Sequence, residues 1–297
     1  MDAPPRHRYR SPDEDSARWD AVRLRPGDVV VSTRSKHGTT WVQAVCLHLV
    51  HGPGPLPSPL PVLAPWVDHL VEPVDELAAR LAAQEHRRVL KTHTPLDGVP
   101  LVAGVTYVVA ARHPLDAAVS LFHQGANLDR AALARLSGAP TPAPRTRPAG
   151  QALEDWLARW VDRDPDPREA LDSLPGVAHH LRDARDRLGG PHDVVLVHYA
   201  DLLADLPGQV RRLAQHLGLE ASDERVDAVT ATTTFAAMRA RADEVAPDAG
   251  VLVDRRAFFR GGRSGDGRAA ASPAVLARYD ARAAELLPED LRAWLHR

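Results

Sequence analysis

The feature that most constrains the fold is an alternation of two hydrophobic periods along the chain. Four short apolar runs have the length and β-branched content of buried strands, and they span residues 28–33, 88–91, 106–111 and 193–199. Segments with helical spacing separate or follow them, at residues 39–51, 74–84, 115–124 and 206–217. Parallel strands need long crossover connections, which helices usually supply. The alternation therefore predicts an α/β fold in which a central parallel sheet has helices on both faces.

Size and charge limit what the protein can be. The chain has 297 residues and 44% hydrophobic content, which is enough for the core of one large domain. No segment has the composition of a strong linker, so we expect a single domain over residues 1–297. The net charge of −2 lacks the Lys/Arg excess of a protein that binds nucleic acid or a membrane surface. Any bound anion must therefore be held by local groups.

The single cysteine and the N-terminal sequence indicate the compartment. Cys46 lies in an apolar run, where an inert core thiol is expected, and one cysteine excludes both an internal disulfide and a cysteine-cluster metal site. The N-terminus has no apolar signal region, and no run approaches the roughly 18 apolar residues of a membrane span. We expect a cytoplasmic protein without nucleic-acid or membrane partners. The sequence leaves the oligomeric state open.

Lysine is almost absent from this chain. Of 37 lysine and arginine residues only two are lysines, Lys36 and Lys91, and each lies at or just after the end of a strand-like run. A lysine provides a compact ammonium with rotatable donors, which the planar guanidinium of arginine does not replace. The two lysines thus indicate sites where such a group is needed. The alternative is that they survived by chance in an arginine-biased sequence.

The loop "SKHGTTW" (residues 35–41) follows the first predicted strand and begins a helix. Free N–H groups at a helix N-terminus favour an anion such as phosphate. Gly38 allows close approach of the backbone, Thr39 and Thr40 add hydroxyl donors, and Lys36 adds a full charge. The pattern is not a Walker loop, because the lysine precedes the glycine. The same residues could also be ordinary turn chemistry.

Two further strand ends carry polar side chains. Lys91 and His93 are two residues apart, so on an extended strand end they point the same way, and they could serve as a cation and a general base. Arg112 ends the third strand and Ser120 lies about two turns into the next helix, so both could face an anion at the sheet edge. His93 could instead be an ordinary strand-end histidine, and Arg112 could form a surface ion pair with Asp116.

Two proline-rich segments, at residues 51–65 and 137–150, are unsuited to helix or central strand. Such long connections often build pockets or lids, although the second could equally be a mobile surface loop. Together with them, five apolar residues are predicted to wall a pocket for an apolar or aromatic molecule, unless they belong to the ordinary core: Trp66, Val67, Leu96, Phe122 and Trp156.

Taken together, six motifs resemble the cytosolic-type sulfotransferase family in its bacterial branch. They are "SKHGTTW", "LKTHTPLDGVP", "ARHPLDAAVSLFH", "LVHYADLLADLPGQVRRLAQHLGL", "TTTFAAM" and "FFRGGRSGD", and they run from about Asp28 to Arg268. The resemblance implies a P-loop-like fold. It also implies transfer of a sulfuryl group from 3′-phosphoadenosine 5′-phosphosulfate (PAPS) to a hydroxyl or amine of a small molecule. The products would be the sulfonated acceptor and adenosine 3′,5′-bisphosphate (PAP), and no metal is implied.

The resemblance also assigns roles to individual residues. His93 would be the general base, Lys36 and Lys91 would stabilise charge on the sulfuryl group and the leaving oxygen, and Ser120 would complete the catalytic set. Trp41 and Phe235 would stack on adenine, and Arg112 and Ser120 would hold the 3′-phosphate. The full nucleotide-binding set would be Lys36, His37, Gly38, Thr39, Thr40, Trp41, Arg112, Ser120, Tyr199, Thr233, Thr234, Phe235, Met238, Arg260, Gly261 and Gly262.

The sequence departs from the family pattern at several positions. His37 replaces a small hydroxyl donor, and Gly261 stands where a second basic residue is usual, although Arg263 is a nearby substitute. Gly267 stands where a tryptophan is common, which puts the packing of the tail in doubt. The usual C-terminal dimer motif is not recognisable.

Two other functions remain open at this stage. Gly261 and Gly267 would suit an inactive nucleotide-binding scaffold. A P-loop kinase using ATP is a weaker alternative, because the chain has no Gly-Lys-Ser/Thr sequence and because ATP could not fill a 3′-phosphate site. The identity of the acceptor cannot be read from the sequence.

Overall fold

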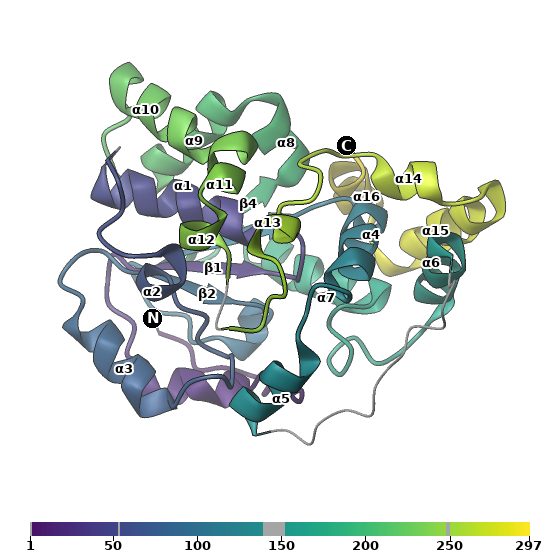
Figure 1. Ribbon diagram of the computed structural model, residues 1–297, viewed down its shortest axis with the longest axis horizontal. Coiled ribbons are helices and arrows are strands. Elements are labelled where there is room, and N and C mark those ends of the chain that lie inside the picture. Colours follow the sequence, from purple (N-terminus) through teal and green to yellow (C-terminus); the bar gives the residue numbers. More distant parts are fainter. Residues whose placement is uncertain (1, 53, 139–151, 248–249) are drawn as a thin grey trace.

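A central parallel sheet organises the molecule (Figure 1). The computed structural model describes residues 2–52, 54–138, 152–247 and 250–297. Within them, four strands pair in the order β2-β1-β3-β4, and every pairing is parallel. The strands are β1 (Val29–Thr33), β2 (Val89–Thr92), β3 (Thr106–Ala111) and β4 (Asp193–His198). The four predicted strands are confirmed, with each end within one residue of the prediction.

Side chains alternate between the two faces of the sheet, as extended strands require. On β1, Val29 and Val31 belong to one apolar core and Val30 to another. The first core is completed by α1 (Thr39–His51), α9 (Leu206–His216) and α10 (Asp223–Thr233). The second is completed by η1 (Ser16–Ala21), α3 (Val74–Ala83), η2 (Leu96–Gly98) and α7 (Leu174–Arg185). Figure 1 shows α1, α9 and α10 on one side of the sheet and α3 on the other, which confirms helices on both faces.

Helices make up most of the rest of the described chain. The remaining ones are α2 (Leu60–Leu63), α4 (Pro114–Gln124), α5 (Arg130–Ser137), α6 (Leu153–Asp162), α8 (Tyr199–Ala204), α11 (Phe235–Ala240), α12 (Ala242–Val245), α13 (Arg255–Phe258), α14 (Asp266–Ala270), α15 (Pro273–Leu286) and α16 (Glu289–Leu295). Among the described residues, no helix combines the length and apolar character needed to cross a membrane.

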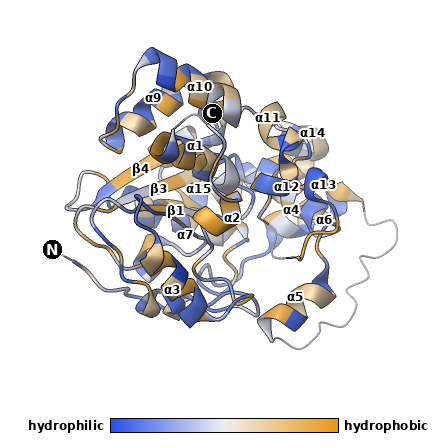
Figure 2. Ribbon diagram, turned by 60° about the vertical axis from the view of Figure 1, so that its left-hand side comes forward, coloured by the Kyte–Doolittle hydropathy of each residue, from blue (hydrophilic) through white to orange (hydrophobic). Residues whose placement is uncertain are grey.

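Most buried side chains of the sheet are apolar. Figure 2 shows hydrophobic colour along β1, β3 and β4. Cys46 lies on α1 in this interior, fully buried and unpaired, and burial raises the pKa of its thiol to about 12. Such a thiol carries almost no thiolate at neutral pH, so the prediction of an inert core cysteine is confirmed.

The strand order places a crevice at the carboxyl end of β1. From β1 the chain passes to β2 on one side and later to β3 on the other. In open α/β sheets, such a reversal of strand order leaves the following loops apart, and ligands bind between them. The loops after β1, β2 and β3 therefore meet where the predicted anion sites and the predicted base lie.

Gly267 allows the C-terminal tail to pack closely on α4. The backbone N–H groups of Gly265 and Gly267 donate to the carboxylate of Asp116, at 2.9 and 2.7 Å. A Cβ atom on Gly267 would lie 2.3 Å from the backbone carbonyl carbon of Leu115. The doubt about tail packing is thus resolved, because backbone contact takes the place of a large side chain.

We expect Gly267→Ala to lower the free energy of unfolding by about 1–3 kcal/mol, because the new methyl group overlaps backbone atoms of α4. Chemical denaturation measures this loss. Gly261→Ala is the matched control, because the nearest atoms to a Cβ there lie 3.8 Å away. Equal stability of the two variants would contradict the close packing.

Candidate active site

A cavity of about 270 Å³ opens where the loops after the strands meet. Segments from Asp13 to Arg263 contribute to its lining, so the fold gathers residues that are distant in the sequence. Fifteen of the predicted site residues line it: Lys36, Gly38, Thr39, Thr40, Trp41, Lys91, His93, Arg112, Ser120, Tyr199, Phe235, Met238, Arg260, Gly261 and Gly262.

The loop between β1 and α1 presents free donors to this cavity. Lys36 and Gly38 have left-handed backbone conformations, with φ of 67° and 97°, and the chain turns sharply there before α1 begins at Thr39. Gly38 is the N-cap residue and provides no side-chain cap, so the first N–H groups of α1 have no capping partner. A Cβ on Gly38 would lie 3.0 Å from the ring of Tyr199. The loop has the form of an anion-binding helix start.

The ammonium of Lys36 lies inside the cavity. Its Nζ is 3.4 Å from Oε1 of Gln124 and 3.8 Å from the ring centroid of Phe258. Removal from water lowers the pKa of Lys36 to about 7, and the positive charges of Arg112 and Lys91 add to this effect. A bound anion would stabilise the charged form of Lys36 and raise its pKa again.

Lys91 projects from β2 into the same cavity. Its Nζ lies 3.9 Å from the ring centroid of Trp66, and the backbones of these two residues form a parallel bridge. Burial lowers the pKa of Lys91 to about 8, although Glu14 and Asp68 oppose the shift. Both lysines of the chain thus face one site.

His93 is oriented as a proton acceptor. Its Nδ1 lies 2.5 Å from the carbonyl oxygen of Thr33. Because a carbonyl only accepts, Nδ1 carries the hydrogen and Nε2 keeps its lone pair. Burial holds the pKa of His93 well below its usual value, and the charges of Lys91 and Arg34 lower it further. The imidazole is therefore neutral at pH 7 and can take a proton.

Two buried residues that the sequence did not reveal hold His93 in place. Asp68 is fully buried and accepts hydrogen bonds from the backbone N–H of His93 at 3.2 Å, from the Thr92 hydroxyl and from Trp19 Nε1. Arg34 is 2% exposed and donates to the His93 carbonyl. Nothing in the sequence separates Arg34 from the many other arginines, and Asp68 belongs to no recognisable pattern.

Arg112 forms a second cationic region of the cavity. Its guanidinium carbon lies 4.4 Å from the ring centroid of Tyr199, and Nη2 donates to the carbonyl of Arg263 at 2.6 Å. Its Nε lies 3.8 Å from Asp116 but has no hydrogen-bond partner. The ion pair with Asp116 considered from the sequence therefore exists, but it is buried and loose, and it leaves a donor unused.

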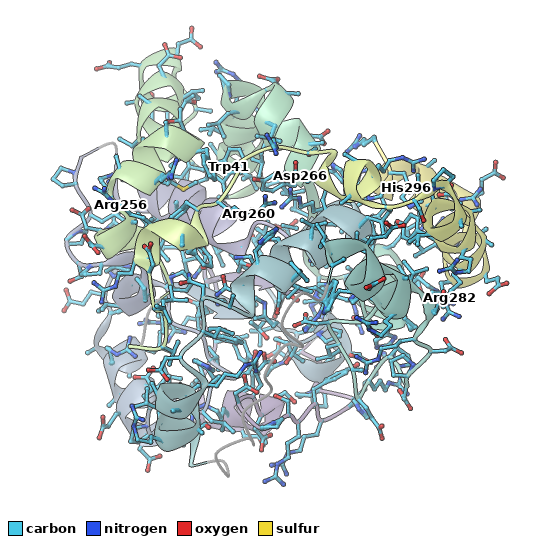
Figure 3. All side chains as sticks on the ribbon, turned by 45° about the vertical axis from the view of Figure 1, so that its right-hand side comes forward. Trp41, Arg256, Arg260, Asp266, Arg282 and His296 are labelled. Atoms are coloured by element: carbon cyan, nitrogen blue, oxygen red, sulfur yellow. The ribbon has the colours of Figure 1, made fainter. Side chains whose placement is uncertain are left out.

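The C-terminal tail closes this side of the cavity. Arg260 and Arg263 both pair with Asp266, at 2.7 and 2.6 Å. Figure 3 shows Arg260 and Asp266 in the same part of the molecule as Trp41, with His296 farther away. Two arginines therefore stand beside Gly261, where the family pattern has its second basic residue.

Three predicted site residues do not line the cavity. His37 is 2% exposed, with Nδ1 2.9 Å from the Ser35 carbonyl, and burial lowers its pKa to about 4. The hydroxyl of Thr233 bonds to the Val229 carbonyl at 2.8 Å, within α10. The hydroxyl of Thr234 caps α11 at Ala237. These side chains support the loops and helices that carry lining residues.

The predicted walls of the acceptor pocket are largely wrong. Trp66 lines the cavity, but Val67 and Leu96 are 0 and 1% exposed in the core under the sheet. Phe122 and Trp156 pack against each other at 5.7 Å and do not line it. The apolar wall is formed by Leu121, Leu128, Leu133, Val251, Leu252 and Phe258.

The two proline-rich segments differ in outcome. The first borders a smaller cavity of about 90 Å³ that shares Trp66, His69 and Lys91 with the main one. Residues 139–151, which include most of the second segment, lie outside the described residues. The predicted link between a proline-rich segment and a pocket therefore applies to residues 51–65.

Comparison with known proteins identifies the family of this chain. The sulfotransferase domain family matches residues 26–289. A glycolipid sulfotransferase of Mycobacterium bovis is 38% identical, over 97% of this chain and 93% of its own length. Among solved structures, retinol dehydratase in complex with retinol and PAP has a TM-score of 0.65, at 21% identity over 93% of this chain and 87% of its own. Mouse sulfotransferase SULT7A1 complexed with PAP has a TM-score of 0.63, at 18% identity over 94% and 91%. The chain belongs to the sulfotransferase family.

Proposed function

We propose that this enzyme transfers a sulfuryl group from PAPS to a hydroxyl or amine of a small molecule with an apolar or aromatic body. The observation that carries the proposal is the meeting of Lys36, Lys91 and His93 in one cavity at the start of α1. The site combines an anion-binding loop, the ammonium groups of two lysines and a neutral imidazole base. Transfer between two oxygens needs these three elements.

The unused donors of the cavity suit a nucleotide with two separate phosphate groups. The uncapped N-terminus of α1 and Lys36 would hold the 5′-phosphosulfate. Arg112, with its unpartnered Nε, would hold the 3′-phosphate together with Ser120, which also lines the cavity. Arg260 would also bind the 3′-phosphate, and for this it would give up part of its ion pair with Asp266. PAPS supplies the transferable sulfuryl group.

Aromatic residues are available for the adenine. Trp41, Tyr199 and Phe235 line the cavity, and the rings of Trp41 and Tyr199 meet edge to face at 5.3 Å. Gly262 has a φ of 60°, and a Cβ there would lie 2.4 Å from the Phe235 ring. We infer that Trp41 and Phe235 enclose the base, with Met238 and Gly261 completing this pocket.

The proposed reaction uses each group once. Nε2 of His93 accepts the proton of the acceptor hydroxyl as its oxygen forms a bond to sulfur. The bond between sulfur and the bridging phosphate oxygen breaks, and Lys36 stabilises the charge that develops on that oxygen. Lys91 stabilises the charge on the sulfuryl oxygens. PAP leaves, and His93 returns its proton to water.

The apolar wall supports an acceptor with an apolar body. Four leucines from α4, α5 and the neighbouring loops lie beside Val251 and Phe258. The mycobacterial relative is named for glycolipids, and the retinol dehydratase structure contains retinol, an apolar alcohol.

Incubation with PAPS and a panel of phenols, alcohols and amines should release PAP. Failure to bind PAP at all would end the proposal.

We expect His93→Ala to lower kcat by about 10²–10⁴-fold while the dissociation constant of PAP changes little, because the variant removes the base and leaves the anion contacts. Steady-state rates and calorimetric titration measure the two quantities. His216→Ala, which alters an exposed histidine of α9, is the control. Full turnover by His93→Ala would remove that residue from its proposed role.

We expect the affinity for PAP to fall as pH rises above about 7, by up to about tenfold per pH unit. The bound anion raises the pKa of Lys36, which is about 7 in the free protein, so the complex holds more protons than the free protein in this range. Calorimetry between about pH 7 and 9 measures the slope. Lys36→Met should make this slope shallower, and Arg278→Met, at an exposed ion pair, should leave it unchanged. A slope unaffected by Lys36→Met would contradict the assignment.

A further inference from the structure

A second polar group of residues lines the cavity and has no part in the proposed reaction. It consists of Asp13, Glu14 and His69. None of the three was identified from the sequence, where "SPDEDS" looks like a solvated acidic stretch. Their position in the cavity calls for a ligand contact or a structural role.

Backbone contacts connect this group to the reacting centre. Glu14 and His69 form an antiparallel bridge, so the N-terminal segment runs beside the turn that contains Trp66 and His69. The rings of His69 and Trp66 are stacked, with centroids 4.1 Å apart and an interplanar angle of 12°. The Trp66 ring also contacts the His93 ring, at a centroid distance of 4.5 Å, and the Lys91 ammonium, whose Nζ lies 3.9 Å from its centroid. The backbone of Glu14 is therefore connected to the proposed base through His69 and Trp66.

The N-terminal segment is firmly attached. The N–H of Asp15 donates to the Asp68 carbonyl at 2.8 Å, and the N–H of Leu70 donates to the Asp13 carbonyl at 2.9 Å. Closer to the N-terminus, the Tyr9 hydroxyl donates to Asp97 at 2.6 Å. Because Asp68 also holds His93, the position of Glu14 is fixed relative to the base.

Polar atoms in this group lack partners. His69 is only 8% exposed, and neither of its ring nitrogens has a hydrogen-bond partner among the described residues. The carboxyl group of Glu14 likewise has neither an ion pair nor a hydrogen bond there. Asp13 has one weak contact, from the Ser11 hydroxyl at 3.3 Å. Asp13 and Glu14 are partly exposed and His69 is nearly buried, so their unpartnered polar atoms face the cavity, where a ligand can satisfy them.

The charge of the cavity decides which ligand fits. Four cations line it, Lys36, Lys91, Arg112 and Arg260, against the carboxyl groups of Asp13, Glu14 and Asp172, and Asp172 is paired with Arg34, so a cationic amine would meet net repulsion. Burial raises the pKa of Glu14 to about 8, which makes its carboxyl group mostly neutral at pH 7 and able both to donate and to accept a hydrogen bond. Neutral hydroxyl groups match such partners.

We propose that Asp13, Glu14 and His69 form a subsite for the non-reacting hydroxyl groups of the acceptor, and that Glu14 determines specificity for a polyhydroxylated headgroup. The acceptor would then be an amphipathic molecule. Its sugar-like head would lie between this subsite and His93, and its apolar body would lie on the leucine wall. This inference rests on the proposed sulfuryl transfer, because it describes the acceptor of that reaction.

Three probes share the same octyl group and differ only in the headgroup: octyl β-D-glucopyranoside, 1-octanol and octylamine. Each is used below any micelle-forming concentration. Their dissociation constants are measured with the PAP-loaded protein by calorimetry, and their sulfonation is measured separately with PAPS. Binding to the PAP complex needs no turnover, so a failure of transfer and a failure of the subsite can be told apart.

We expect the glucoside to bind at least about tenfold more tightly than 1-octanol, as one or two hydrogen bonds to buried partners imply. Glu14→Ala should remove this advantage and leave 1-octanol binding unchanged within about twofold. Glu14→Gln should retain most of it, because an amide also donates and accepts. Asp20→Ala, at an exposed acid of the same segment, is the matched control.

Several results would overturn the inference. Equal binding of glucoside and 1-octanol by the wild-type protein would show that no hydroxyl subsite exists. An equal loss for both probes in Glu14→Ala would show that Glu14 has a structural role only. Preferred binding of octylamine, lost alike in Glu14→Ala and Glu14→Gln, would make the carboxylate a counterion for an amine.

Discussion

The concentration of positive charge in one partly enclosed cavity is the constraint on which the rest of the site depends. The pKa values of Lys36 and Lys91, lowered to about 7 and 8, express the cost of gathering these groups without an anion. Burial, together with the charges of Lys91 and Arg34, keeps His93 neutral. One electrostatic arrangement thus prepares both the anion site and the base, and filling the anion site relieves the repulsion.

The fold and the centre of this site could be predicted because they depend on local pattern and on one topological rule. The hydrophobic periods of strands and helices can be recognised directly in the sequence, and parallel strands bring their carboxyl ends to one edge of a sheet. Lys36, Lys91 and Arg112 each lie just after or at the end of a predicted strand, so they had to approach one another. The resemblance to sulfotransferases then linked them to more distant residues such as Phe235.

Other parts of the site depend on packing that no short pattern encodes. Trp66 and Val67 lie at a turn, where Trp66 lines the cavity and Val67 packs into the core under the sheet. His37 turns inward toward its own loop instead of the cavity. Glu14 reaches the site only because the N-terminal segment pairs with residues 68–70, a long-range contact between short irregular segments.

The most direct test of the central claim is the pKa of Lys36 in solution. Because the chain has only two lysines, selective isotope labelling gives two ammonium signals, which Lys36→Arg and Lys91→Arg variants assign. An NMR titration should place the pKa of Lys36 near 7 in the free protein and markedly higher with PAP bound. A pKa near the ordinary lysine value of 10.5 in both states would show that the cavity imposes no electrostatic cost for an anion to relieve.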